Sequence, residues 1–331
     1  MRTVRLEGNS MVSVVEVPDP VAGTGEVLVR TAMSALCGSE LKGYRGAGQE
    51  KGNSGHEAAG TVVAVGPGVE RPKVGERVGV SAIAGCGRCA FCARGQYTWC
   101  PERKFYGSMH AEMFVAAANA CHVLPADVPW EVGVLLTGDG LGVPYHTSAK
   151  IGDRAAQSVA VFGMGPIGLG HALLQSYLGR RVIAVDLVPY RLELARKLGA
   201  AEAVNAGTTG DAVAAVRAST GGEGADVCIE AAGRPETFKH CLGAVRTGGL
   251  VLVNGEQPRV ELSPSEDLIR RDITVTGAWF YHFSEFTSML ALYRQGLRVG
   301  DLVTHSFPLS DAAAAYREFA TGRTGKTLLV M

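Results

Sequence analysis

A glycine-rich turn after an apolar run constrains the fold of this chain more than any other feature. The run, 159–162, is apolar at every position, and the residues that follow, 163–168, carry glycines at G-x-G-x-x-G spacing. Helical periodicity continues to Tyr177, and a second apolar run, 181–185, ends at Asp186. This order of strand, turn, helix, strand and acidic residue is typical of a dinucleotide-binding unit, because glycines let the backbone approach a pyrophosphate at a helix N-terminus. The residues expected to form this contact are Gly163, Gly165, Pro166 and Ile167.

Asp186 indicates which dinucleotide binds. It lies 18 residues beyond Gly168, where a carboxylate can accept hydrogen bonds from the ribose hydroxyls of the adenosine. The same negative charge would repel the 2′-phosphate of NADP, so we expect NAD. Arg191, five residues further on, either contacts the ribose, stacks on the adenine or lies in solvent on a helix.

Composition excludes several classes of partner. The 331 residues are enough for two domains, and 47% hydrophobic with 19% charged residues is typical of a globular protein. Basic and acidic residues number 32 each, which gives no reason to expect nucleic acid or an anionic membrane as a partner. The N-terminus lacks the apolar core of a signal peptide. We therefore expect a cytoplasmic protein, in which eight cysteines point to metal or catalysis before disulfides.

Strand and helix signals divide the chain into two kinds of sequence. Short β-type stretches dominate the first part, for example 13–17, 26–30 and 61–65. From residue 141 to about 278, strands alternate with helical segments, which predicts a doubly wound parallel sheet in an α/β protein. The last strand, 326–330, is expected to rejoin the first domain. The expected strands of the parallel sheet are 159–162, 182–185, 203–204, 226–229, 250–253 and 273–276.

Four cysteines lie close together in residues 86–100, a segment with little that could build a core. They form two C-x-x-C steps and one wider return. Zn²⁺ in a structural site takes four such ligands in a tetrahedron, so the segment predicts a closed zinc lobe that stabilises the fold and performs no chemistry. The alternative is four independent thiols. The predicted ligands are Cys86, Cys89, Cys92 and Cys100.

A second set of candidate ligands is dispersed along the chain. Cys37 lies in a loop of the β-rich part, His56 and Glu57 precede a strand, and Asp139 lies between two glycines. Each alone is more often a core or surface residue than a ligand. Together they could supply one thiolate, one imidazole and one carboxylate, which are three protein ligands with a fourth position open, as a catalytic zinc needs. Sequence periodicity does not establish that these residues meet.

These motifs together resemble the zinc-dependent medium-chain alcohol dehydrogenases, in particular the threonine, sorbitol and butanediol dehydrogenase type. The matching stretches are 36–39, 55–57, the cysteine lobe, the glycine turn with Asp186, and 325–327. The resemblance implies a GroES-like β-rich catalytic domain at 1–140 and 279–331 and a Rossmann NAD-binding domain at 141–278. It also implies two zinc ions per subunit, one catalytic and one structural.

Carried over to this sequence, the resemblance assigns roles to single residues. Cys37, His56 and Asp139 match the catalytic zinc ligands, and Glu57 matches a carboxylate behind the metal that sometimes binds it. Asp139 is a harder ligand than the cysteine often found there, so it should leave the zinc more Lewis-acidic. Lys326 matches a basic residue that neutralises the pyrophosphate.

The proton pathway departs from the pattern of the family. Ser39 matches the hydroxyl that accepts the substrate proton, whereas Lys42 stands where relatives often have histidine, and it either relays the proton, contacts the cofactor or is solvated. Glu40 stands where relatives commonly have aspartate, a position that would orient His56. His110 is expected to face the substrate.

The resulting expectation is NAD-linked oxidation of a secondary alcohol, polyol or sugar-like alcohol to a ketone, with reversible hydride transfer. Two alternatives remain: a zinc-independent quinone or enoyl reductase of the same superfamily, and a nucleotide-binding or sensing protein without activity on the same fold. Residues 272–280 resemble the segment through which family members pair, so a homodimer or homotetramer is expected.

Overall fold

The computed structural model describes all 331 residues, which form two compact units. Unit 1 comprises Met1–Gly142 and Phe280–Met331, and unit 2 comprises Val143–Trp279. None of the helices combines the length and the apolar character that a bilayer span requires.

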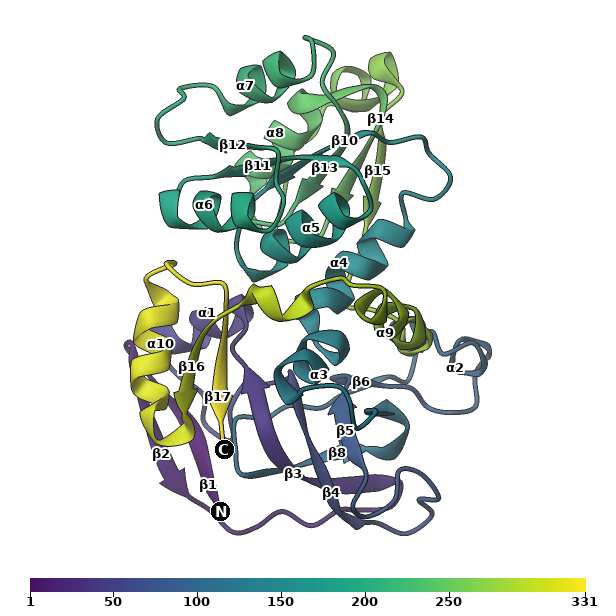
Figure 1. The fold of residues 1–331 in the computed structure, drawn as a ribbon, viewed down its shortest axis with the longest axis vertical. Helices are drawn as coiled ribbons and strands as arrows, with labels where there is room; N and C mark the ends of the chain where they lie inside the picture. Colours follow the sequence, from purple (N-terminus) through teal and green to yellow (C-terminus); the bar gives the residue numbers. More distant parts are fainter. The chain divides into compact units, whose positions relative to one another are not determined.

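Unit 2 is a six-stranded parallel sheet with helices on both faces. The strand order is β12-β11-β10-β13-β14-β15, the 3-2-1-4-5-6 order of a Rossmann fold. Helices α5 and α6 cover one face and α7 and α8 the other (Figure 1). The predicted doubly wound sheet is confirmed. Its elements are β10 (Ser158–Phe162), α5 (Pro166–Tyr177), β11 (Arg181–Asp186), α6 (Pro189–Lys197), β12 (Glu202–Asn205), α7 (Ala212–Ser219), β13 (Ala225–Glu230), α8 (Pro235–Ala244), β14 (Val245–Val253) and β15 (Thr274–Gly277).

The apolar runs of the sequence form the centre of this sheet because each strand is covered on both faces. Val159, Ala160 and Val161 are fully buried in β10, and the neighbouring β11 buries Val182 and Ile183 in the same way. Continuous apolar runs of this kind are typical of parallel strands. The carboxyl end of β10 therefore lies at the middle of the sheet, where the glycine turn begins.

Unit 1 is built on a seven-stranded, mostly antiparallel sheet. The order is β16-β17-β3-β4-β5-β9, and β8 pairs with the other end of β3. Since β17 pairs with β3, the C-terminal residues belong to the sheet formed by the first part of the chain. The strands are β3 (Glu26–Ala35), β4 (Ala58–Val65), β5 (Arg77–Val80), β8 (Met113–Ala117), β9 (Cys121–Val123), β16 (Val303–Pro308) and β17 (Lys326–Val330).

An N-terminal hairpin and short helices complete unit 1. The hairpin joins β1 (Arg2–Gly8) to β2 (Met11–Glu16), in a stretch where the sequence predicts β structure and a strand at 13–17. Helix α3 packs on β3, β4 and β5, and α10 packs on β2, β16 and β17. The helices are α1 (Leu41–Arg45), α3 (Trp130–Thr137), α4 (Asp139–Ala149), which continues into unit 2, α9 (Phe286–Arg294) and α10 (Ala312–Ala320).

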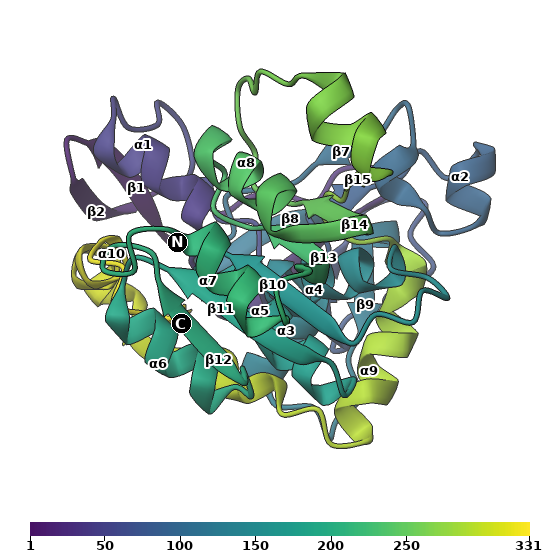
Figure 2. The same cartoon turned by 90° about the horizontal axis from the view of Figure 1, so that it is seen from above.

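The cysteine-rich segment forms a small lobe at the periphery of unit 1, as both views show (Figures 1 and 2). Two short strands, β6 (Ile83–Ala84) and β7 (Lys104–Phe105), pair at its base. A single turn of helix, α2 (Ala90–Ala93), lies between them. A lobe with so little secondary structure needs another source of stability, which a bound metal can supply.

Candidate functional site

The four cysteines of the lobe converge on one point. Their sulfur atoms all lie within 4.8 Å of one another. The Sγ–Sγ distance is 3.5 Å between Cys89 and Cys92 and 3.9 Å between Cys86 and Cys92. A tetrahedral zinc with Zn–S bonds of about 2.3 Å places its sulfurs about 3.8 Å apart. The donor set and the spacing therefore fit a structural zinc ion.

Backbone amides of the lobe stabilise negative charge on its sulfurs. The amide of Cys92 donates to Cys89 Sγ at 3.4 Å, and that of Cys86 donates to Cys100 Sγ at 3.4 Å. Hydrogen bonds from the Arg88 backbone lower the pKa of Cys86 to about 7. Burial raises the pKa of Cys92 to about 12. The lobe thus offers one thiol that ionises readily and one that needs a metal to ionise at neutral pH.

The dispersed candidates also converge, in a second cluster formed by Cys37, His56, Glu57 and Asp139. Cys37 follows β3 at the start of a 3₁₀ turn, His56 and Glu57 precede β4, and Asp139 is the first residue of α4. Their ligand atoms all lie within 4.8 Å of one another. The three segments are far apart in sequence. They meet because β3 pairs with β4, and because α3, which ends just before Asp139, packs on both strands.

The geometry of this cluster fits a cation. The Oδ2 atom of Asp139 lies 3.2 Å from His56 Nε2 and 3.6 Å from Cys37 Sγ. The other oxygen of Asp139, Oδ1, is buried without a hydrogen-bond partner. A buried carboxylate oxygen without a donor is costly unless a cation or water satisfies it. Thiolate, imidazole and carboxylate together are ligands that zinc accepts.

Partners behind the cluster hold the ring of His56, the backbone of Asp139 and the carboxylate of Glu57. His56 Nδ1 lies 2.8 Å from the carbonyl oxygen of Ser54, which orients Nε2 toward Asp139. The amide of Asp139 donates to Glu57 Oε2 at 2.9 Å. Glu57 Oε1 accepts a hydrogen bond from the ammonium group of Lys326 in a fully buried ion pair. Both carboxylate oxygens of Glu57 are therefore engaged behind the cluster.

Charges around the cluster shift its titration. Burial alone would lower the pKa of His56, but hydrogen bonds from its ring to Asp139 and Cys37 raise the pKa well above its ordinary value. Burial also opposes the charge of Lys326, yet Glu57 and its acidic neighbours raise the pKa of the lysine. The raised pKa favours the protonated ring of His56, and a metal ion that binds Nε2 must displace that proton.

The structure adds a contact for Lys326 that the sequence did not suggest. Its side chain is 1% exposed, and its ammonium group faces Glu57. The two residues are 269 positions apart, and no local signal pairs them. The predicted contact between Lys326 and the pyrophosphate remains a prediction.

Two expectations about the surroundings of the site are wrong. Glu40 does not orient His56, whose Nδ1 is held by the carbonyl of Ser54. Glu40 instead lies 3.0 Å from His110 Nε2, because its carboxylate is directed into the core beside that ring. His110 does not face a substrate, since it is fully buried. Although burial would raise the pKa of Glu40, the charge and hydrogen bond of His110 lower it.

The residues predicted to carry the proton lie at the surface of unit 1. Ser39, in the 3₁₀ turn after Cys37, is exposed, and so is Lys42 in α1. Ser39 lies two residues after Cys37 in the sequence, and Lys42 lies five residues after it.

In unit 2, the glycine turn has the shape that the motif predicts. Gly163 has a φ of +98°, and a Cβ there would lie 2.8 Å from Ala232; a Cβ at Gly168 would lie 1.8 Å from the carbonyl oxygen of Gly163. These two glycines are therefore required by the fold. A Cβ at Gly165 would meet nothing within 4 Å, so this position borders open space at the N-terminus of α5.

Asp186 has a structural partner at the same turn. Its carboxylate accepts hydrogen bonds from the amides of Met164 at 2.6 Å and Val188 at 2.8 Å. It therefore fixes the glycine turn, and its further lone pairs remain for a ligand. Arg191, in the first turn of α6, is half-buried, and its Nε is buried without a hydrogen-bond partner.

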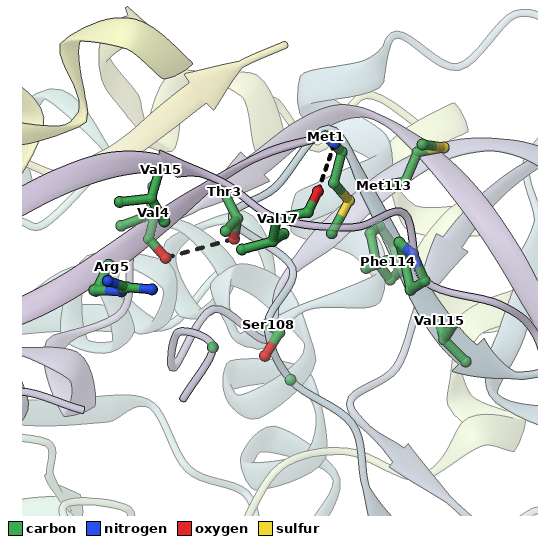
Figure 3. A pocket seen from close by; sticks show the side chains of 13 residues that line it. Met1, Thr3, Val4, Arg5, Val15, Val17, Ser108, Met113, Phe114 and Val115 are labelled. Carbon is green, nitrogen blue, oxygen red and sulfur yellow. Dashed lines mark hydrogen bonds between the residues drawn. The ribbon is translucent and has the colours of Figure 1, made fainter. Parts of the chain in front are cut away.

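Unit 1 also has a pocket of about 330 Å³ beside the N-terminal strands (Figure 3). Met1, Thr3 and Val17 line one side, and Met113 and Phe114 line the other. No candidate ligand and no predicted proton-carrying residue lines it. The pocket is distinct from the metal clusters.

Comparison with known proteins agrees with this architecture. Residues 23–126 match the alcohol dehydrogenase GroES-like domain family, and residues 166–295 match the zinc-binding dehydrogenase family. The chain is 35% identical to the L-threonine 3-dehydrogenase of Symbiobacterium thermophilum, over all of this chain and 97% of that protein.

Solved structures are similar over the full length. The alcohol dehydrogenase TADH from Thermus sp. ATN1 is 30% identical, with a TM-score of 0.89 over all of this chain and 99% of its own. An alcohol dehydrogenase from E. coli CFT073, solved with its cofactor NADH, is 25% identical, with a TM-score of 0.88 over all of this chain and 99% of its own. The chain belongs to the zinc-dependent medium-chain alcohol dehydrogenase family, which confirms the predicted family and fold class.

Proposed function

We propose that this protein is an NAD-dependent zinc alcohol or polyol dehydrogenase, and that Cys37, His56 and Asp139 hold its catalytic zinc. The observation that carries the proposal is the convergence of these three ligands around a buried carboxylate oxygen without a partner. The four-cysteine lobe holds a second, structural zinc. The catalytic domain corresponds to residues 1–140 and 279–331, and the NAD-binding domain to residues 141–278.

When bound, zinc supplies a Lewis acid that polarises the substrate oxygen, and NAD supplies the hydride acceptor. The chain supplies position and proton transfer. Ser54 and Glu57 hold His56 and Asp139 through the contacts described above, so two of the three ligands are preorganised. Ser39 accepts the proton of the substrate hydroxyl at its Oγ atom and passes it to solvent directly or through Lys42.

Unit 2 supplies the nucleotide site. The open face of Gly165 and the backbone amides of Gly165 and Ile167 at the start of α5 would hold the pyrophosphate, because the helix dipole there favours negative charge. Ile167 lies in the same first turn. Asp186 binds the adenosine ribose, and Arg191 contacts the ribose or the adenine.

Two aromatic rings favour an apolar group on the substrate. Phe105 and Phe280 lie with their ring centroids 5.8 and 6.0 Å from that of His56, and 6.0 Å from each other. Phe105 is 56% exposed. Phe280 has a φ of +53°, which a bulky residue adopts only where its surroundings enforce it. A substrate beside these rings gains more from a methyl or alkyl group than from a further hydroxyl.

An exposed sheet edge and the free cysteines bear on assembly and location. The edge strand of the unit 2 sheet is β15, whose Thr274 and Val275 are exposed. An unpaired edge of this kind can pair with a second copy, which favours a homodimer or homotetramer. Eight free cysteines suit the reducing cytoplasm.

An NAD⁺-reduction screen tests the proposal. The panel contains secondary alcohols, diols, polyols, sugar alcohols and threonine, each with NAD⁺ and NADP⁺. We expect NAD⁺ reduction with at least one secondary alcohol or diol. A protein that carries two zinc ions and binds NADH but oxidises none of these compounds would instead support a sensing role.

A further inference from the structure

A buried polar cluster behind Cys37 has no place in the function proposed so far. It consists of Glu40, His110, Tyr316 and Ser34, whose side chains are at most 1% exposed. Glu40 Oε2 lies 3.0 Å from His110 Nε2 and also accepts a hydrogen bond from the Tyr316 hydroxyl. His110 Nδ1 lies 2.8 Å from Ser34 Oγ. Such a network is stable in a core only because its members satisfy one another.

The network reaches the proposed metal ligand through one carboxylate oxygen. The backbone amide of Cys37 donates to Glu40 Oε1 at 2.9 Å, and the amide of Glu40 donates to the carbonyl of Cys37 at 3.1 Å. This reciprocal pair closes the 3₁₀ turn that carries Cys37. The other oxygen of Glu40 is fixed by residues from two distant segments. The turn that carries Cys37 is therefore anchored to the core through Glu40.

His110 also packs against the segment that carries His56. A Cβ at Gly55 would lie 2.6 Å from the His110 ring, so the ring rests on the backbone one residue before His56. Asn53 Oδ1 accepts hydrogen bonds from the amides of Gly55 and His110, each at 3.1 Å. His110, which contacts Glu40 in the Cys37 turn, thus also packs on the segment that carries His56.

We propose that Glu40, held by His110 and Tyr316, is a positioning residue that sets the place of Cys37 relative to His56. The three proposed ligands then have three separate supports: Glu40 for Cys37, the Ser54 carbonyl for His56, and Glu57 for Asp139. The inference rests on the proposed catalytic metal site. Replacement of a support of this kind typically weakens metal binding 10–100-fold.

Metal affinity tests this role without reliance on activity. Zinc is titrated against a chelator in the wild-type protein and in Glu40→Ala, and Co²⁺ is used to record the thiolate charge-transfer absorption of the Cys37 site. We expect Glu40→Ala to weaken zinc binding at this site about 10–100-fold and to alter the Co²⁺ spectrum. The four-cysteine lobe serves as an internal control and should keep its zinc. Glu40→Gln, which retains an acceptor for the Cys37 amide, should restore most of the affinity.

Glu230→Ala is a matched control. Glu230 is also a fully buried carboxylate that accepts backbone hydrogen bonds, from Ala232 and Gly233 at 2.9 Å, but it lies in unit 2. Its replacement should leave both zinc affinities unchanged. If Glu40→Ala does not fold, His110→Phe keeps a ring in place while removing the hydrogen bond to Glu40, and we expect about tenfold weaker zinc binding.

Two results would overturn the proposal: wild-type zinc affinity at the Cys37 site in the folded Glu40→Ala or His110→Phe protein, or equal weakening in Glu230→Ala. Failure of the proposed function looks different, because the wild-type protein would then bind zinc in the lobe alone and show no Co²⁺ absorption from Cys37.

Discussion

The two metal clusters use the same chemistry in opposite surroundings. The lobe draws all four ligands from residues 86–100 and lies on little more than two short strands and one helical turn. The second cluster draws Cys37, His56 and Asp139 from three distant segments and lies among buried side chains. The lobe has four thiols and no open position, whereas the second cluster has mixed ligands supported from behind by charged residues.

In the lobe, we expect the bound metal to stabilise the local fold. In the second cluster, the surrounding fold holds the ligands in place before the metal binds. The lobe packs on the rest of unit 1 through the rings of Tyr97 and Trp99, but its own ion pair between Arg88 and Glu102 is exposed and contributes little without zinc. The second cluster keeps its geometry through Glu40, Ser54 and Glu57. Loss of metal should therefore cost stability in the lobe and activity in the other cluster.

The largest effect is expected for His56→Ala. The substitution removes one of three protein ligands, so kcat/KM for alcohol oxidation should fall by about 1000-fold or more. Since the supporting residues remain, circular dichroism and the thermal transition should change little. Steady-state kinetics of purified enzyme check this; activity within tenfold of wild type would exclude His56 as a ligand.

Cys92→Ser should have the complementary effect. It removes a thiolate from a closed four-ligand site, and the zinc that stabilises the lobe should be lost with it. We expect zinc release and protease cleavage within residues 86–100, while the second cluster keeps its metal. Limited proteolysis with mass spectrometry gives the cleavage sites; an intact lobe without zinc would contradict the structural role.

Lys326→Met tests the buried charges around the second cluster. It leaves Glu57 buried without its cation, which typically costs about 3–5 kcal/mol. Arg88→Ala breaks an exposed ion pair of the lobe and should cost less than about 1 kcal/mol. Chemical denaturation of the zinc-loaded proteins compares the two. A similar loss of unfolding free energy in the two variants would show that the ion pairs of the two clusters contribute equally to stability.

The last comparison concerns pH. Zinc binding to the lobe must displace the protons of its four thiols. Cys86 has a pKa of about 7, so part of it is already ionised near neutral pH and releases no proton. The second cluster must lose the proton of one thiol and that of His56, whose pKa is raised. Both affinities should fall as pH falls, with a slope in log K that goes from about four near pH 6 to about three near pH 8 for the lobe, and with a slope of about two for the second cluster. Chelator competition between pH 6 and 8 measures the slopes, and equal slopes would refute the ligand assignment.

The same contrast explains what the sequence could predict. The lobe and the glycine turn are local motifs. The spacing of the residues within 86–100 and within 163–168 was therefore sufficient to predict a cysteine-rich metal lobe and a dinucleotide-binding turn. The parallel sheet followed from alternating apolar runs, because strands buried on both faces have few polar residues. The grouping of Cys37, His56 and Asp139 came from the resemblance to a family and not from periodicity.

The supports of the second cluster could not be predicted, because they depend on packing between distant segments. Glu40 meets Tyr316 across 276 positions and Glu57 meets Lys326 across 269. The sequence shows glutamate at position 40, but nothing in the sequence indicates its contact with His110. The expectation that Glu40 orients His56 failed for this reason.

Elemental analysis of zinc in the wild-type and Asp139→Ala proteins tests the central claim most directly. We predict two zinc ions per chain in the wild-type protein and one in the variant, with NAD⁺ reduction lost. Two zinc ions and undiminished NAD⁺ reduction in the variant would contradict the assignment of Asp139, and with it the metal site proposed here.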